Sequence, residues 1–546
     1  MRRYTQGSKK MIFPQMGLGR GGTMSYNTNL YLLLFLPLVA LAYQLTPKKH
    51  RWKTLLIASI LFFTDFSSYL ILWTLLTAAI TWCGGLLIQN IQDKNAALPR
   101  ELRMKPKDLA HRTVRVLRPA LIGVIGILAV LKYTNFTMQT MANLMNQMGA
   151  HDTYQPLKIL VPIGISFYSL QAAGYLLDIH WRRFRAETNF GKLFLFLIFF
   201  PTLMEGPIMR WEDMKDQLFE GESITLLSLS QGLIRIGWGL FKRMVISDRM
   251  NTMVTVLFQP QNHYSGLMIL LTGVVVTVQL YMEFSGTIDI VIGSARIFQI
   301  RLTENFRQPF LAQSAAEFWR RWHITLGVWF KNYIFYPVST SGLMKKWAKF
   351  GRKHCGKYIT NLVISAIALF PVWMLNGLWH GPKAPYILYG VYYFVILLLE
   401  VAVEPLEKGL CRKAGWNYNA AGLRIFRRVR TFFIIITGET LFRCDTWSQF
   451  TGMLGRLFTG GDGGLFEGRI LEIGADAGDL LIMAIGCVIV FTVNYHLEKN
   501  PDLLEQIPMK PAVQRWTIYY AFLFSILIFG AYGTGYQAVD LIYAGF

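Results

Sequence analysis

Residues 375–382 read LNGLWHGP and end an apolar run that begins at Ile359. The run contains no charged residue, only small polar groups and Pro371, and it has the length of a membrane-spanning helix. Ionisable residues at membrane depth are costly, usually face the protein interior and mark functional sites. The stretch therefore predicts a membrane span with a functional histidine, His380, at its end. An interfacial histidine beside Trp379, an aromatic belt residue, is the alternative.

The composition extends this interpretation to the whole chain. Hydrophobic residues make up 53% of the sequence and charged residues 16%, against about 25% charged in soluble domains. Runs long enough to cross a bilayer lie near 30–46, 70–90, 117–133, 159–179, 193–209, 266–284, 359–379, 384–403, 477–495 and 516–533. Four further runs could be spans, re-entrant pieces or interfacial helices: 54–69, 225–246, 286–300 and 431–443. We expect an all-α polytopic membrane protein with roughly 10 to 13 membrane segments.

The net charge of +23 comes mainly from loops between the predicted spans. Basic residues cluster in 48–53, 100–118, 182–185, 345–357 and 412–430. An excess of Lys and Arg is typical of cytoplasmic loops, so we place these loops in the cytoplasm, beside anionic membrane lipid. The loop 444–476 has few basic residues and is expected on the outer side. Because this distribution explains the charge, no nucleic-acid partner is predicted.

The first 23 residues are rich in Lys, Arg and Gly and lack the apolar region of a signal peptide. Residues 17–22 match the pattern G-x-G-x-x-G, but no strand–helix unit surrounds them, so dinucleotide binding is not predicted. The sequence RGGTM ending at Met24 can be encoded by a purine-rich stretch that resembles a bacterial ribosome-binding site. We therefore expect 1–23 to be a non-native or disordered extension and 24–546 to be a single membrane domain.

Two kinds of chemistry lack their usual sequence patterns. The five cysteines have no paired spacing, so neither a metal site nor a disulfide framework is predicted. The nucleophile pattern G-x-S-x-G is absent, so a serine-hydrolase mechanism has no support.

A second histidine, His323, lies in the sequence EFWRRWHITLGVWFKNY at residues 317–333. Tryptophan, arginine and amide side chains are dense around it. An active-site histidine is one interpretation of this segment. An amphipathic interfacial helix, whose histidine caps or bridges loops, is the other.

Five shorter motifs precede these two segments. They are LVPIGISFY (160–168), FPTL (200–203) with GPI (206–208), GLFKR (239–243), FSG (284–286) and ENF (304–306). In this order, the motifs and the two histidine segments resemble the membrane-bound O-acyltransferase family, and within it the branch of bacterial alginate O-acetylases. The resemblance covers most of the chain after Met24. It implies a helical bundle around a central channel.

The resemblance also implies that His380 is the catalytic histidine and His323 the second active-site histidine. Acyl transfer to a hydroxyl requires a base near the hydroxyl and donors for the developing oxyanion. Imidazole suits the first role because it accepts a proton near neutral pH, and a water-poor site keeps it neutral.

Three residues are expected to support the histidines. Asn376 lies four residues before His380 and shares its helix face, where it could orient the imidazole or bind a neighbouring helix instead. Trp379 adjoins His380. Asp289 ends the segment EFSGTID (283–289). In the family, this segment usually begins with an aspartate and has a tyrosine after the glycine. This chain has Glu283 and Thr287 at those two positions, whereas Asp289 matches the family pattern.

Three basic residues are candidates for contact with the acyl donor: Arg320, Arg321 and Lys331. They could bind a phosphate or pantetheine group on the cytoplasmic side, although basic residues at an interface are more often lipid-facing anchors. Glu205, before Gly206, is unusual because small residues are commoner there in the family. Its ligand is not evident from the sequence.

The function that the resemblance implies is O-acylation at a bacterial cytoplasmic membrane. An acyl group, most simply acetyl, would pass from a cytoplasmic thioester, acetyl-CoA or a carrier-protein thioester, to hydroxyls of an extracytoplasmic polysaccharide. No tightly bound cofactor is expected, and an extracytoplasmic partner of the SGNH-hydrolase type is implied. The alternatives are a D-alanyl transferase acting on teichoic acid, which is disfavoured by the long chain after His380, and a transporter or flippase, which is disfavoured by the lack of internal repeats.

Overall fold

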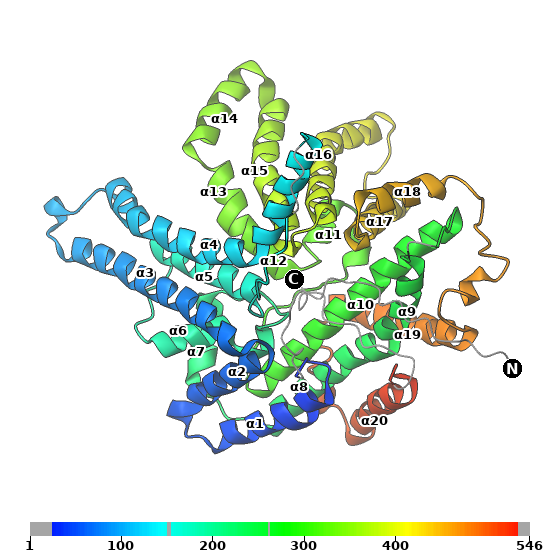
Figure 1. The fold of residues 1–546 in the computed structure, drawn as a ribbon, viewed down its shortest axis with the longest axis horizontal. Helices are drawn as coiled ribbons and strands as arrows, with labels where there is room; N and C mark the ends of the chain where they lie inside the picture. Colours follow the sequence, from blue (N-terminus) through cyan, green and yellow to red (C-terminus); the bar gives the residue numbers. More distant parts are fainter. Residues whose placement is uncertain (1–23, 150–153, 260–261, 533–546) are drawn as a thin grey trace.

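The computed structural model describes residues 24–149, 154–259 and 262–532, and these form helices joined by turns and irregular segments (Figure 1). The proposed extension 1–23 lies outside the described residues. The helices are α1 Leu36–Leu45, α2 Arg51–Ser67, α3 Ile71–Ala97, α4 Pro106–Gln147, α5 Ile165–His180, α6 Phe190–Ile198, α7 Trp211–Glu220, α8 Leu226–Leu240, α9 Asp248–Leu257, α10 Leu267–Ile297, α11 Ala315–Trp319, α12 Ile324–Phe330, α13 Tyr336–Ser339, α14 Gly342–His354, α15 Gly356–His380, α16 Ala384–Lys413, α17 Ala421–Arg443, α18 Trp447–Leu457, α19 Ala477–Lys499 and α20 Ala512–Phe529.

Seven segments of the described chain are long and apolar enough to cross a membrane. They are Lys48–Ala97, Pro106–Gln147, Leu267–Ile297, Gly356–His380, Ala384–Lys413, Ala477–Lys499 and Ala512–Phe529. The first contains both α2 and α3, which are separated at Ser68, where φ is 21°. The prediction of an all-α polytopic membrane protein is confirmed.

The structure differs from the expected spans in three places. In the run 159–179, the helix α5 begins only at Ile165, after Gly164 with its positive φ of 73°. Residues 193–209 do not form one span, because α6 ends at Ile198 and the short 3₁₀ turn Phe200–Thr202, which contains Pro201, leads into a buried irregular segment. In contrast, the runs 266–284 and 286–300 form the single helix α10. Gly286, at the start of the second run, is tolerated inside the helix because it serves a packing contact.

Helix α10 lies at the centre of the molecule and is buried along nearly its whole length (Figure 1). It crosses α8 at very short range: a Cβ atom added to Gly239 would lie 2.4 Å from the carbonyl oxygen of Gly286. A Cβ atom added to Gly232 would lie 2.6 Å from the carbonyl oxygen of Gly293. Small residues allow helix backbones in membranes to approach this closely. Two of the recognised motifs, GLFKR and FSG, therefore meet at this crossing.

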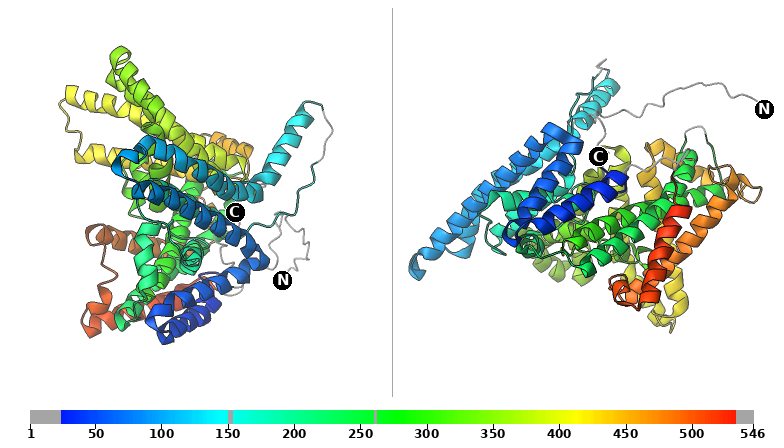
Figure 2. Two further views of the ribbon diagram at one scale, coloured as in Figure 1. Left: turned by 90° about the vertical axis from the view of Figure 1, so that its left-hand side faces the viewer. Right: turned by 90° about the horizontal axis from the view of Figure 1, so that it is seen from below.

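The hairpin of α15 and α16 is packed in the same way. A Cβ atom on Gly377 would lie 2.4 Å from the carbonyl oxygen of Tyr386, and one on Gly390 would lie 2.3 Å from that of Trp373. The group α14, α15 and α16 stands on one side of the molecule, and the long pair α3 and α4 projects from another (Figures 1 and 2). The tight hairpin fixes the end of α15, where His380 lies.

Candidate active site

His380 is the last residue of α15 and is buried in a box of aromatic rings. Its ring centroid lies 5.0 Å from those of Trp379 and Phe442, and 6.0 Å from that of Tyr389. These neighbours come from α15, α17 and α16. Tyr389 in turn donates a hydrogen bond of 3.0 Å to Glu439, a buried carboxylate of α17. No sequence pattern singled out Glu439 or Tyr389, because their proximity to His380 arises from the packing of three helices.

Helix α4 holds the end of α15 in place. The ammonium group of Lys132 donates to the carbonyl oxygen of Trp379 at 2.7 Å and to Ser166 Oγ at 2.9 Å. The hydroxyl of Tyr133 donates to the carbonyl oxygen of Leu378. The last carbonyls of a helix lack partners within the helix, and a cation there also interacts favourably with the helix dipole. Lys132 thus fixes the backbone next to His380.

Sequence reasoning missed Lys132, although a signal was present. It is a charged residue within the predicted span 117–133, and charged residues inside spans are functional candidates by default.

His323 is the N-cap residue of α12 and has a left-handed backbone, with φ 45° and ψ 52°. This conformation is uncommon for residues other than glycine and is found at functional sites. Asn305 stabilises it: the Asn305 side-chain oxygen accepts hydrogen bonds from the backbone N–H and the hydroxyl of Thr325, both at 3.0 Å. The same oxygen lies 3.4 Å from Nδ1 of His323. Asn305 belongs to the motif ENF, so this motif has a local structural explanation.

The two histidines meet at Trp379. The indole ring lies 5.5 Å from the ring of His323 and 5.0 Å from that of His380, measured between centroids. On its other side, the ring of His323 contacts Phe284 of the motif FSG at 4.9 Å. Complete burial lowers the pKa of His323 to about 3, so this imidazole is neutral at physiological pH. The structure therefore brings together His380, His323 and Trp379, and their catalytic roles stay a prediction.

Asn376 is buried one turn before His380 on α15. Among the described residues its side-chain oxygen has no hydrogen-bond partner. Its role as a support for His380 stays a prediction.

Asp289 lies in an ion-pair cluster. It accepts from Arg235 at 2.6 Å and pairs with Lys242, and Arg235 also binds Glu304 at 2.7 Å. Because Glu304 precedes Asn305, the cluster connects α8 and α10 to the segment that holds His323. This geometry indicates that Asp289 stabilises the packing of the segment that holds His323, and it gives Asp289 a structural role.

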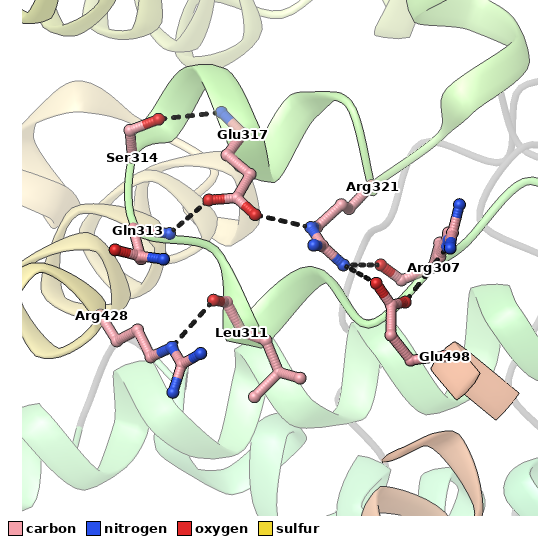
Figure 3. A network of polar contacts seen from close by, with 8 residues as sticks. All are labelled: Arg307, Leu311, Gln313, Ser314, Glu317, Arg321, Arg428 and Glu498. Carbon is pink, nitrogen blue, oxygen red and sulfur yellow. Dashed lines mark hydrogen bonds and ion pairs between the residues drawn. The ribbon is translucent and has the colours of Figure 1, made fainter. Parts of the chain in front are cut away.

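The three candidate donor-binding residues have different environments. Arg321 donates to Glu317 at 3.0 Å and to Glu498 of α19 at 3.1 Å, within the polar network of Figure 3. Arg320 and Lys331 are exposed. The geometry therefore gives Arg321 a structural role in anchoring the segment before His323. It leaves Arg320 and Lys331 accessible to solvent, lipid or a donor.

Glu205 and Glu283 form a second buried acidic group, together with Arg243. Burial, and then the nearby Glu283 carboxylate, raise the pKa of Glu205. Among the described residues neither oxygen of Glu205 has a hydrogen-bond partner. Arg243 donates to Thr287 at 2.6 Å, at the position where the family usually has tyrosine. The departures from the family pattern thus lie in one buried cluster.

Two buried imidazoles in an aromatic site at the end of a membrane helix are groups that can transfer protons in a water-poor environment. The model of the membrane-bound O-acyltransferase family matches residues 26–351, which include His323. The chain belongs to this family and is an acyltransferase of the multi-pass membrane type.

Three similar proteins match different shares of the chain. A probable alginate O-acetylase of Pseudomonas syringae pv. tomato is 31% identical over 447 residues, which cover 81% of this chain and 77% of the relative. The peptidoglycan O-acetyltransferase of Helicobacter pylori is 27% identical over 46% of this chain and 49% of its own length. The teichoic acid D-alanyltransferase of Bacillus subtilis is 27% identical over 53% of this chain and 70% of its own length.

Proposed function

We propose that the protein moves an acetyl group from a cytoplasmic thioester toward the hydroxyls of an extracytoplasmic polysaccharide, with His380 as the general base. The observation that carries this proposal is the contact of both buried imidazoles with Trp379. His380 would take the proton of the acceptor hydroxyl as its oxygen attacks the thioester carbonyl carbon. The carbon–sulfur bond then breaks, and the proton passes from His380 to the leaving thiolate.

The acetyl assignment is supported by the extent of the matches. The alginate O-acetylase relative is matched over 81% of this chain, whereas the D-alanyltransferase of Bacillus subtilis is matched over 53%. An acetyl donor would be acetyl-CoA or a carrier-protein thioester that enters from the cytoplasm. In that case Arg320 and Lys331, which are exposed, are the basic residues best placed to meet its phosphates. Arg321 would act by holding the segment.

The setting of the reaction follows from the same proposal. The protein would lie in the cytoplasmic membrane of a bacterium. It would take the acyl group from a donor on the cytoplasmic side and pass it to an acceptor on the outer side. A soluble extracytoplasmic enzyme of the SGNH-hydrolase type would complete transfer to the polymer.

Labelled donors offer the direct test. Purified protein in vesicles would receive acetyl-CoA, an acetylated carrier protein or a D-alanyl carrier protein, each labelled in the acyl group, together with polysaccharide and an SGNH-type partner. We expect label from an acetyl donor on the partner or the polymer. Exclusive transfer from the D-alanyl carrier would replace the proposal by D-alanylation, and no transfer from any donor would favour a transporter.

A further inference from the structure

A cavity of about 490 Å³ opens between α10, α17 and α19, apart from the two histidines. Its walls are mainly apolar: Val274 and Val278 of α10, Phe432 of α17 and Phe491 of α19. Its floor is Phe310, whose ring lies 5.9 Å from that of Phe432 and 6.0 Å from that of Phe491. The volume falls in the range of ligand-binding pockets, and such pockets combine apolar walls with a few placed polar groups.

One such polar group is the side chain of Gln308. This residue lines the cavity, is 9% exposed, and its amide nitrogen has no hydrogen-bond partner among the described residues. A buried donor without a hydrogen-bond partner is energetically unfavourable. The backbone of Gln308 is also left-handed, with φ 49°, a conformation associated with functional positions. The amide is therefore a donor available to an acceptor oxygen of a ligand.

Two cations stand at the mouth of the cavity. Arg428 is exposed and donates from Nε to the carbonyl oxygen of Leu311, a lining residue, at 3.2 Å (Figure 3). Lys499 is exposed, and its ammonium lies 4.5 Å from the ring centroid of Tyr495, another lining residue. Neither cation forms an ion pair with a carboxylate of the described chain. Arg428 lies in the basic segment 412–430, which the charge distribution assigns to the cytoplasm. Lys499 ends α19, whose other end follows the loop 444–476 that is expected on the outer side.

We infer that this cavity binds an anionic glycerophospholipid of the membrane. The apolar walls take an acyl chain, the Gln308 amide donates to an ester carbonyl oxygen, and Arg428 and Lys499 bind the phosphate. Arg428 and Lys499 lie one helical turn beyond the lining residues Phe432 and Tyr495. Gln308 and Phe310 belong to the segment that leads to His323. A bound lipid would therefore also stabilise the position of that segment.

Photo-crosslinking tests the inference without requiring acyl transfer, so its failure is separable from failure of the proposed function. The full chain is placed in phosphatidylcholine vesicles that contain phosphatidylglycerol with a diazirine in its acyl chain. After irradiation, we expect adducts concentrated on peptides around Phe432 and Phe491. Helix α20, whose described residues are not buried, reports ordinary contact with bulk lipid. Labelling of the cavity no higher than that of α20 would overturn the inference.

Variants sharpen the assignment. Val278→Trp fills the cavity and should abolish its adducts while α20 is labelled as before; unchanged cavity labelling would overturn the site. Arg428→Gln and Lys499→Gln should each lower cavity labelling by phosphatidylglycerol about fivefold. These exposed substitutions do not disturb packing, and Arg412→Gln, at the exposed end of α16, is the matched control. Equal labelling in all three charge variants would contradict the headgroup assignment.

A competitor distinguishes the source of the phosphate. Unlabelled phosphatidylglycerol should displace the probe at least as well as a polyisoprenyl phosphate. Stronger displacement by the polyisoprenyl phosphate would overturn the assignment to a membrane phospholipid in favour of a lipid-linked substrate.

Discussion

At the scale of single residues, the site depends on side chains that position the histidines from outside their own segments. Lys132 binds the carbonyl group next to His380, and Asn305 binds the turn after His323. Both contacts satisfy backbone groups at helix ends, where partners within the helix are lacking. Loss of either contact should therefore displace an imidazole without removing it.

Lys132→Met should lower kcat about 10- to 100-fold, because removing a partner from buried acceptors costs about 1–3 kcal/mol. The KM for the donor should change little, since Lys132 contacts the end of α15. Steady-state kinetics of purified protein would measure both constants. Lys158→Met, at an exposed lysine, is the control. Wild-type kcat in Lys132→Met would show that this contact does not position His380.

At the scale of helices, the histidine segments are held by two close crossings and by buried ion pairs. The α8–α10 crossing depends on paired glycines, and the Asp289 cluster lies beside it. The α15–α16 crossing depends on Gly377 and Gly390. These contacts explain why short motifs far apart in the sequence contribute to one site.

Asp289→Asn should destabilise the protein by about 3–5 kcal/mol, because it leaves the charges of Arg235 and Lys242 without their shared carboxylate. The Tm in detergent measures the loss. The double variant Asp289→Asn, Lys242→Met should recover part of it, since one uncompensated charge is then removed. Asp93→Asn is the control, because Asp93 pairs with Arg185 at the surface, where ion pairs contribute about 0–1 kcal/mol. Equal effects of Asp289→Asn and Asp93→Asn would contradict the structural role of the cluster.

Gly377→Leu should separate α15 from α16 and lower both the Tm and the activity, since overpacking costs about 1–3 kcal/mol. Gly409→Leu in α16 is matched to it, because a Cβ atom there meets no atom within 4 Å. Thermal unfolding and acyl transfer are measured on both variants. A Gly377→Leu protein with wild-type Tm would show that the hairpin does not require close approach.

At the scale of the whole molecule, the charge pattern predicts the orientation in the membrane. Single cysteines placed in a cysteine-free variant can be labelled from outside intact cells. Positions in 91–116 and 404–430 should be protected, and positions in 444–476 should react. External labelling of Arg103→Cys would reverse the assignment of the cytoplasmic side.

Much of the architecture could be predicted because spans such as 359–378 are set by local composition. The segment 193–209 could not be predicted in this way, since its apolar residues are buried in protein around a break at Pro201. In the site, His380 and His323 stood out by residue type and motif. Their meeting at Trp379, and the support from Lys132 and Asn305, arise from packing between distant segments.

In the proposed mechanism, His380 performs the proton transfer at a site shared with His323. His380→Ala should reduce acyl transfer by about 10²–10⁴-fold, the range for loss of a general base, while abundance and Tm stay near wild type. His354→Ala, at an exposed histidine of α14, should leave transfer unchanged. The measurement is transfer of labelled acetyl by equal amounts of folded protein. Full transfer by His380→Ala at normal abundance would contradict the account.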